Sequence, residues 1–266
     1  LNEKPEIYDS INTAIIDEVD GNIQINNLSF KYPNTEKNVL TNINLRINKG
    51  ETLGIIGRTG SGKTTSLYAF LNTINTPSRK IITAEDPIEY QLSGINQVQV
   101  DKSIGMTFGK ALRAMLRQAP NIIMVGEIRD METGEIAINA ALTGHLVFST
   151  LHTNDAPGAV TRLVDMGVKP FLVASSVKAV MAQRLVRRIC ESCAVPTEAE
   201  EEELRLLEAD PKDFEDVKLM KGRGCVACGN SGYKGRMGIY EIFMITENIQ
   251  KLIFDNKPSN EIRDAA

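Results

Sequence analysis

The chain has 266 residues, 42% of them apolar, which is enough for one large α/β domain and a smaller appendage. Acidic residues outnumber basic ones by 34 to 30 and the net charge is −4, whereas nucleic-acid binding depends on clustered Lys and Arg, so we expect no nucleic-acid partner. No apolar run approaches the roughly 20 residues of a membrane-spanning helix, and no leader pattern opens the chain, so we expect a cytoplasmic protein without a transmembrane segment.

The first segment, residues 1–50, predicts a small antiparallel sheet. Gly21–Asn26, Leu28–Phe30 and Ile43–Ile47 have the pattern of strands, and Pro33 and Asn34 mark a turn between them. We expect a P-loop core over residues 51–188, and a cysteine-bearing subdomain with a helical end over residues 189–266.

Residues 55–65, IIGRTGSGKTT, satisfy the phosphate-loop pattern G-x-x-x-x-G-K-[ST] at every fixed position. Thr52–Ile56 predicts a buried strand and Lys63–Ile74 a helix, so backbone N–H groups and the helix dipole would surround phosphate oxygens. The alternative is a glycine turn without a ligand. The predicted nucleotide-binding residues of the loop are Gly57, Arg58, Thr59, Gly60, Ser61, Gly62, Lys63, Thr64 and Thr65.

The bound nucleotide is expected to be a triphosphate with Mg²⁺. Lys63 would reach the β- and γ-phosphates, and the Thr64 hydroxyl would coordinate the metal.

Three later strand patterns, Lys80–Ala84, Asn121–Val125 and Leu146–Leu151, each end in polar residues. Ligands of an open parallel sheet bind outside the carboxyl ends of its strands, so these ends should converge on the phosphates. Carboxylates there would hold the metal or orient the attacking water, and a merely solvated acid is the alternative for each. The candidates are Glu85, Glu89 and Glu127.

Both histidines lie within residues 143–155. His152, at the end of a predicted strand, could sense a γ-phosphate by hydrogen bonding. For His145 a satisfied structural role stays open. Farther along, Arg184, Arg187 and Arg188 form the one basic cluster, which we interpret as the solvated end of a helix.

Four cysteines form two C-x-x-C pairs, a pattern of metal-binding thiolates in a cytosolic composition. Residues 194–224 separate the pairs, more than the roughly 15–20 residues of compact zinc sites, because residues 198–208 insert an acidic helical pattern. A four-thiolate site is closed and structural, and reduced thiols without metal are the alternative. The predicted Zn²⁺ ligands are Cys190, Cys193, Cys225 and Cys228.

The tail is expected to form a turn over Gly229–Gly238, a strand and helix over Ile239–Phe254, and a last helix capped by Ser259.

From about Thr64 to Asp264 the chain resembles the ATPases of type II secretion and type IV pilus assembly. The motifs that carry the resemblance are the P-loop, an Asp box ITAEDPIE ending at Glu89, a Walker B IIMVGEIRD around Glu127, and a His box from Thr143 to Asp155. The tetracysteine is similar to that of assembly ATPases, and family members continue beyond the last residue here. The resemblance implies a RecA-like α/β fold with a mostly parallel sheet.

By this resemblance Glu85 acts on the attacking water, Glu127 holds Mg²⁺ through water, and His152 reads the nucleotide state. The assignment of roles between Glu85 and Glu127 stays open. The resemblance also implies ATP as substrate, a homohexamer, inner-membrane platform proteins as partners, and a place at the cytoplasmic face of the inner membrane.

Residues 1–63 are similar instead to the start of an ABC exporter nucleotide-binding domain, through Ile23–Pro33, Val39–Leu45 and Gly50–Gly57. In that family an aromatic residue at the place of Tyr32 stacks on adenine, although Tyr32 could also pack on the sheet. The motif LSGINQ at Leu92–Gln97 lacks the second glycine of the ABC signature. We therefore expect a hybrid, engineered rather than natural, whose two parts join within the P-loop.

Two functions follow, an ATPase or a nucleotide-binding hybrid with little turnover, and an ABC-type ATPase is the third alternative. In the secretion family an N-terminal domain supplies arginines to the γ-phosphate, and we expect this chain to lack it. Arg58, Arg113 and Arg117 are weak substitutes.

Overall fold

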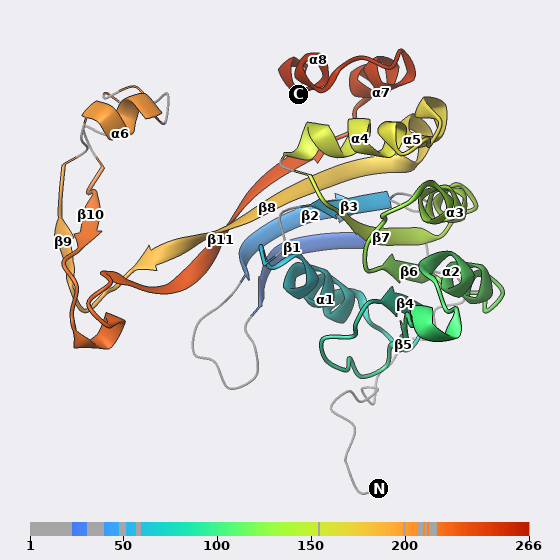
Figure 1. Ribbon diagram of the computed structural model, residues 1–266, viewed down its shortest axis with the longest axis horizontal. Coiled ribbons are helices and arrows are strands. Elements are labelled where there is room, and N and C mark those ends of the chain that lie inside the picture. The colour runs from blue at the N-terminus through green and yellow to red at the C-terminus, as the bar shows by residue number, and fades with distance from the viewer. Residues whose placement is uncertain are drawn as a thin grey trace, which may run out of the picture. The chain divides into compact units, whose positions relative to one another are not determined.

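The structure is a computed structural model of all 266 residues (Figure 1). It describes residues 23–30, 40–47, 52–56, 60–153, 155–198, 201–206, 210, 212 and 217–265. The predictions for Tyr32 and for Gly57, Arg58 and Thr59 lie outside these residues.

A seven-stranded sheet in the order β11-β8-β3-β7-β6-β4-β5 organises the larger part of the chain. The pairs β8–β3, β3–β7, β7–β6, β6–β4 and β4–β5 are parallel. This confirms the α/β class with a mostly parallel sheet. The strands are β3 (Thr52–Ile56), β4 (Ile81–Glu85), β5 (Asn96–Gln99), β6 (Ile122–Val125), β7 (Leu146–Leu151), β8 (Val177–Ile189) and β11 (Tyr233–Met244).

Helices cover both faces of this sheet, because the apolar residues of its strands alternate between two buried clusters. Met124 and Phe148 pack in the cluster of helix α1, while Ile123 and Val147 pack in the cluster of α2, α3, α4 and α5. Figure 1 shows α1 on one side of β4, β6 and β7, and α2 and α3 on the other. The helices are α1 (Lys63–Ile74), α2 (Phe108–Leu116), α3 (Met131–Leu142), α4 (Ala156–Asp165), α5 (Pro170–Ser176), α7 (Glu247–Phe254) and α8 (Ser259–Asp264).

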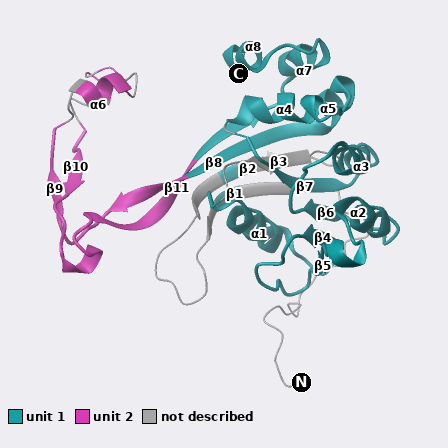
Figure 2. Ribbon diagram, viewed as in Figure 1, with its two compact units in different colours: residues 1–184, 240–266 teal, residues 185–239 magenta. Residues whose placement is uncertain are grey.

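By its contacts the chain divides into two compact units, residues 1–184 with 240–266, and residues 185–239 (Figure 2). The second unit contains a two-stranded antiparallel sheet, the acidic helix and a short 3-10 helix. The division into three segments that we expected from the sequence stays a prediction. The elements of this unit are β9 (Ala194–Pro196), α6 (Glu201–Leu206), β10 (Met220–Gly222) and η3 (Val226–Cys228).

The predicted N-terminal sheet is present as a hairpin-like pair. Strands β1 (Ile23–Phe30) and β2 (Leu40–Ile47) run antiparallel, with Ile23 opposite Ile47. The pairing shifts near Asn27, whose positive φ of 51° and backbone bond to the Asn44 side chain mark an irregularity in the strand.

Two local predictions were wrong. Arg184, Arg187 and Arg188 lie on strand β8 and not at a helix end, because the preceding residues of β8 pair with β3 in the sheet. Arg187 lies 4.0 Å from the centre of the Tyr233 ring, and Arg188 pairs with Glu191 at 3.2 Å. Helix α8 begins at Ser259 and is preceded by Pro258 in the capping position.

Among the described residues, none of the helices has both the length and the apolar character needed to cross a bilayer.

Substitution of Phe148 tests the packing of the core under helix α1, because this side chain on the central strand β7 is fully buried. We expect Phe148→Ala to lower the free energy of unfolding by about 3–5 kcal/mol through lost burial and a residual cavity. Phe254→Ala, at a position 65% exposed, should change it by less than about 1 kcal/mol. Urea unfolding measures both variants, and equal losses would contradict this placement of β7.

Candidate functional site

The described part of the P-loop, residues 60–62, leads directly into α1 beyond the carboxyl end of β3. Gly60 and Gly62 have φ of 79° and 84°, a left-handed backbone that side chains disfavour, and α1 begins at Lys63 as predicted. The Ser61 hydroxyl is buried and has no hydrogen-bond partner among the described residues. A buried polar atom in that condition fits a loop that binds phosphate oxygens.

Lys63 is only 8% exposed, and this burial lowers the pKa of its ammonium group. The Glu127 carboxylate acts in the opposite direction, which places it within electrostatic reach of Lys63. The predicted convergence of the whole set of site residues on the P-loop stays a prediction.

Glu127 is positioned by hydrogen bonds that join three strand ends. Gly126 N–H donates to the Ala84 carbonyl at 2.7 Å, and Ile128 N–H donates to the Thr150 carbonyl at 3.0 Å. The Thr150 hydroxyl donates to the Gly126 carbonyl at 2.7 Å. The backbone on both sides of Glu127 is thus fixed between β4 and β7.

The Glu127 carboxylate lies between two cationic or polar side chains. Arg129 donates to one oxygen, and His152 Nε2 lies 3.1 Å from the other. Burial alone would raise the pKa of Glu127, but Arg129 and then His152 hold it below the ordinary value. Arg129 also faces Asp86 at 3.8 Å. Glu127 is consequently an anion whose orientation is fixed by Arg129 and His152.

Glu85, the last residue of β4, is 2% exposed and accepts hydrogen bonds from three side chains. The Tyr68 hydroxyl donates to Oε2, while the Thr83 hydroxyl at 2.5 Å and the Gln97 amide at 3.0 Å donate to Oε1. Because Gly126 packs against the backbone of Ala84 and Glu85, this carboxylate sits next to the strand end that carries Glu127.

Glu89 and His145 make different contacts. The side chain of Glu89 is exposed, and its N–H donates to the Tyr68 hydroxyl at 3.3 Å. His145 Nδ1 lies 3.0 Å from the Ala140 carbonyl at the end of α3, which satisfies the ring locally. The structural interpretation of His145 fits this contact.

Sequence reasoning identified His152 but missed the other residues that contact the two glutamates. Arg129 lies within the quoted Walker B stretch, and its charge two residues after Glu127 was the available signal. Tyr68 sits in the apolar helix α1, and Thr83 and Gln97 lie on separate strands. Their common function depends on contacts that no local pattern shows.

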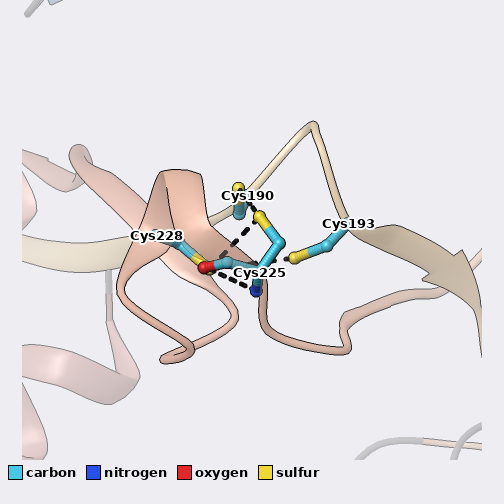
Figure 3. A group of neighbouring side chains, drawn as sticks. All are labelled: Cys190, Cys193, Cys225 and Cys228. Carbon is cyan, nitrogen blue, oxygen red and sulfur yellow. Dashed lines mark hydrogen bonds between the residues drawn. The ribbon is translucent and has the colours of Figure 1, made fainter.

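The four cysteines come together in the second unit (Figure 3). Cys190 and Cys193 follow β8, Cys225 precedes η3 and Cys228 ends it. Their sulfur atoms all lie within 4.8 Å of one another and form no disulfide, so the cluster could hold a metal ion. Burial would raise the pKa of Cys228, but N–H groups of Cys225 and Gly232 hold it at about 6.

The fold and this edge of the sheet define an α/β protein of the P-loop class. Residues 9–266 match the model of the Type II/IV secretion system protein family, and the chain belongs to that family.

Relatives and a solved structure agree with this assignment. The chain is 54% identical over 208 residues to type II secretion system protein E of Pseudomonas aeruginosa, covering 78% of this chain and 41% of that protein. It is 50% identical over 212 residues to the type IV pilus assembly ATPase PilB of Thermus thermophilus, covering 80% and 24%. The crystal structure of the pilus retraction motor PilT with bound ADP superposes with a TM-score of 0.59 at 30% identity, covering 82% and 53%.

The chain therefore spans less than half the length of the two relatives. The family match includes most of residues 1–63. The similarity of that segment to ABC exporters and the hybrid origin are not tested by these comparisons and stay predictions.

The charge on Glu127 should appear in the pH dependence of stability. Its pKa in the folded protein is below the ordinary 4.5, so its contribution is full above that value and is lost as the pH falls through the folded value. We expect the difference in unfolding free energy between the wild type and Glu127→Gln to shrink on acidification from pH 7 to about 3.5. Urea unfolding at each pH measures it, and a constant difference would contradict the ion pairs.

Proposed function

We propose that the chain is the ATP-hydrolysing core of a type II secretion or type IV pilus assembly motor. The observation that carries the proposal is the contact of His152 with Glu127 at the carboxyl ends of the strands, together with the electrostatic effect of Glu127 on the P-loop Lys63. Nucleotide hydrolysis needs this combination, a cation for the phosphates, a carboxylate for the metal and a polar group near the γ-phosphate.

We assign roles by position. Lys63, with Ser61 and the backbone of Gly60 and Gly62, would bind the β- and γ-phosphates. Thr64, at the start of α1, and Glu127 would hold Mg²⁺. When bound, the ion neutralises charge that develops on the transferred phosphoryl group.

Glu85 would act on the attacking water, and His152 would respond to the γ-phosphate. The side chain of His152 is 52% exposed, so a ligand can reach it, and its bond to Glu127 would couple its orientation to the metal carboxylate. Three donors fix the Glu85 carboxylate, so the attacking water would have to approach it from a defined direction. If Glu85 and Glu127 exchange roles, the same groups are used.

The tetracysteine is proposed as a structural Zn²⁺ site. Four sulfurs arranged tetrahedrally at the roughly 2.3 Å zinc–sulfur distance lie about 3.8 Å apart. Cys190 and Cys225, and likewise Cys193 and Cys228, have sulfurs 3.9 Å apart, while Cys225 and Cys228 have sulfurs 3.7 Å apart. Four protein ligands leave no open coordination position. Zinc would therefore hold the two cysteine-bearing loops together and take no part in turnover.

The family also suggests an assembly and a location. We propose a homohexamer at the cytoplasmic face of the inner membrane, bound to platform proteins of the secretion or pilus machine. The names of the relatives, a type II secretion protein and a pilus assembly ATPase, support this proposal.

A second candidate function is nucleotide binding with little turnover. One observation favours it. Arg113 on α2, considered above as a source of positive charge for the γ-phosphate, pairs instead with Glu132 on α3 at 2.5 Å. A neighbouring subunit would then have to supply the charge that speeds phosphoryl transfer.

Phosphate release from Mg-ATP tests the enzyme. We expect Glu127→Gln to lower kcat by at least about 100-fold, because the metal carboxylate is lost. Glu247→Gln, on the exposed first turn of α7, is the matched control and should leave kcat unchanged. Equal release by the wild type and Glu127→Gln would overturn the proposal, and ATP binding without any release would support the second candidate.

Elemental analysis tests the metal site. We expect one zinc per chain, and loss of that zinc in Cys193→Ser, because three thiolates bind zinc far more weakly than four. Ser192→Ala, an exposed change between two of the cysteines, is the control that should retain the metal. Thermal unfolding after chelation should show a lower midpoint only for chains that had bound zinc, and a folded wild type without zinc would contradict the site.

A further inference from the structure

Among the polar side chains of helix α1, Tyr68 is the one that bonds to Glu85. Tyr68 is fully buried, and its hydroxyl uses both of its hydrogen-bonding functions. It accepts from Glu89 N–H at 3.3 Å and donates to Glu85 Oε2. Since the Glu89 N–H can only donate, the hydroxyl proton is directed to Glu85.

The other carboxylate oxygen of Glu85, Oε1, is also fixed by hydrogen bonds. The Thr83 hydroxyl and the Gln97 amide both donate to Oε1, at 2.5 and 3.0 Å. The Gln97 side chain is itself fixed, because its Oε1 accepts from Leu92 N–H at 2.7 Å and its amide also donates to the Tyr90 carbonyl at 3.2 Å. Hydrogen bonds to both oxygens therefore fix the orientation of the Glu85 carboxylate.

The ring of Tyr68 is fixed as well. It meets the Tyr90 ring edge to face, with ring centres 4.6 Å apart, and it lies in the apolar cluster of α1. Burial, and then the bond to Glu85, raise the pKa of Tyr68 above its ordinary value, so the hydroxyl keeps its proton. A tyrosine in this position is a permanent donor with little freedom to move.

We propose that Tyr68 is a positioning residue that sets the Glu85 carboxylate relative to the P-loop, with Thr83 and Gln97 completing the contacts. The proposal rests on the proposed function, in which Glu85 acts during ATP hydrolysis. Lys63 and Tyr68 belong to the same helix, so the phosphate-binding group and the support of Glu85 move as one body. Displacement of a reacting group by about 1 Å can cost on the order of 100-fold in rate.

Tyr68→Phe tests the proposal, because it removes the hydroxyl and keeps the buried ring. We expect kcat for ATP hydrolysis to fall on the order of 10-fold to 100-fold, with KM for ATP within about 3-fold of the wild type, since Glu85 does not bind the phosphates. Tyr233→Phe, at a 37% exposed tyrosine of the second unit, is the matched control with unchanged kcat.

A double-mutant cycle separates positioning from general loss of structure. In a Glu85→Gln background, measured by single turnover at high protein concentration, Tyr68→Phe should lower the rate no further. An equal loss in both backgrounds, or unchanged kcat in Tyr68→Phe, would overturn the proposal. If Tyr68→Phe does not fold, Thr83→Val removes the donor to the other oxygen without changing shape and should give the same split between kcat and KM, and unchanged kcat would again overturn the proposal.

The outcome for the proposed function is distinguishable. A wild type whose phosphate release does not depend on Glu127 rejects the ATPase and this inference together. A wild type that depends on Glu127 but not on Tyr68 rejects only the inference.

Discussion

The site depends on the way the backbone around Gly126 is held between its two neighbouring strands. Its N–H reaches the end of β4, its carbonyl accepts from Thr150 on β7, and Ile128 N–H returns to the Thr150 carbonyl. A side chain at position 126 would approach the Ala84 carbonyl to 3.2 Å, so glycine allows this close packing. Glu85, Glu127 and His152, far apart in sequence, are thereby brought to one edge.

Local signals were sufficient for the elements that carry their own start and stop. The glycine turn followed by apolar residues at helical spacing predicted α1 with its observed bounds, because a left-handed Gly62 and the following helix need no distant partner. The ends of β6 and β7 were likewise visible as apolar runs followed by polar residues. The rule for parallel sheets pointed to the strand ends where His152 contacts Glu127, but it did not distinguish these residues from the exposed Glu89.

Contacts between distant residues decided what the sequence did not reveal. The run from Val177 to Ile189 is apolar and then basic, and nothing local distinguishes a helix from a strand. Pairing of Thr52–Ile56 with residues 177–182 makes it a strand. The donors to Glu85 stand on three different elements, so their convergence follows from the completed sheet and α1. The members of the cysteine cluster could be identified from the sequence because each C-x-x-C pair is local, although the geometry that joins the pairs is not.

Helix α1 connects these observations mechanically. Tyr68 ties it to β4 through Glu85, and the Ser66 hydroxyl ties it to β8 through the buried Gln183 side chain at 2.7 Å. Buried hydrogen bonds of this kind are costly to break without a replacement partner. A shift of α1 caused by phosphate at its N-terminus would therefore either be resisted or be passed to both strands together. The same bonds that hold Glu85 in place therefore also join helix α1 to strands on the sheet.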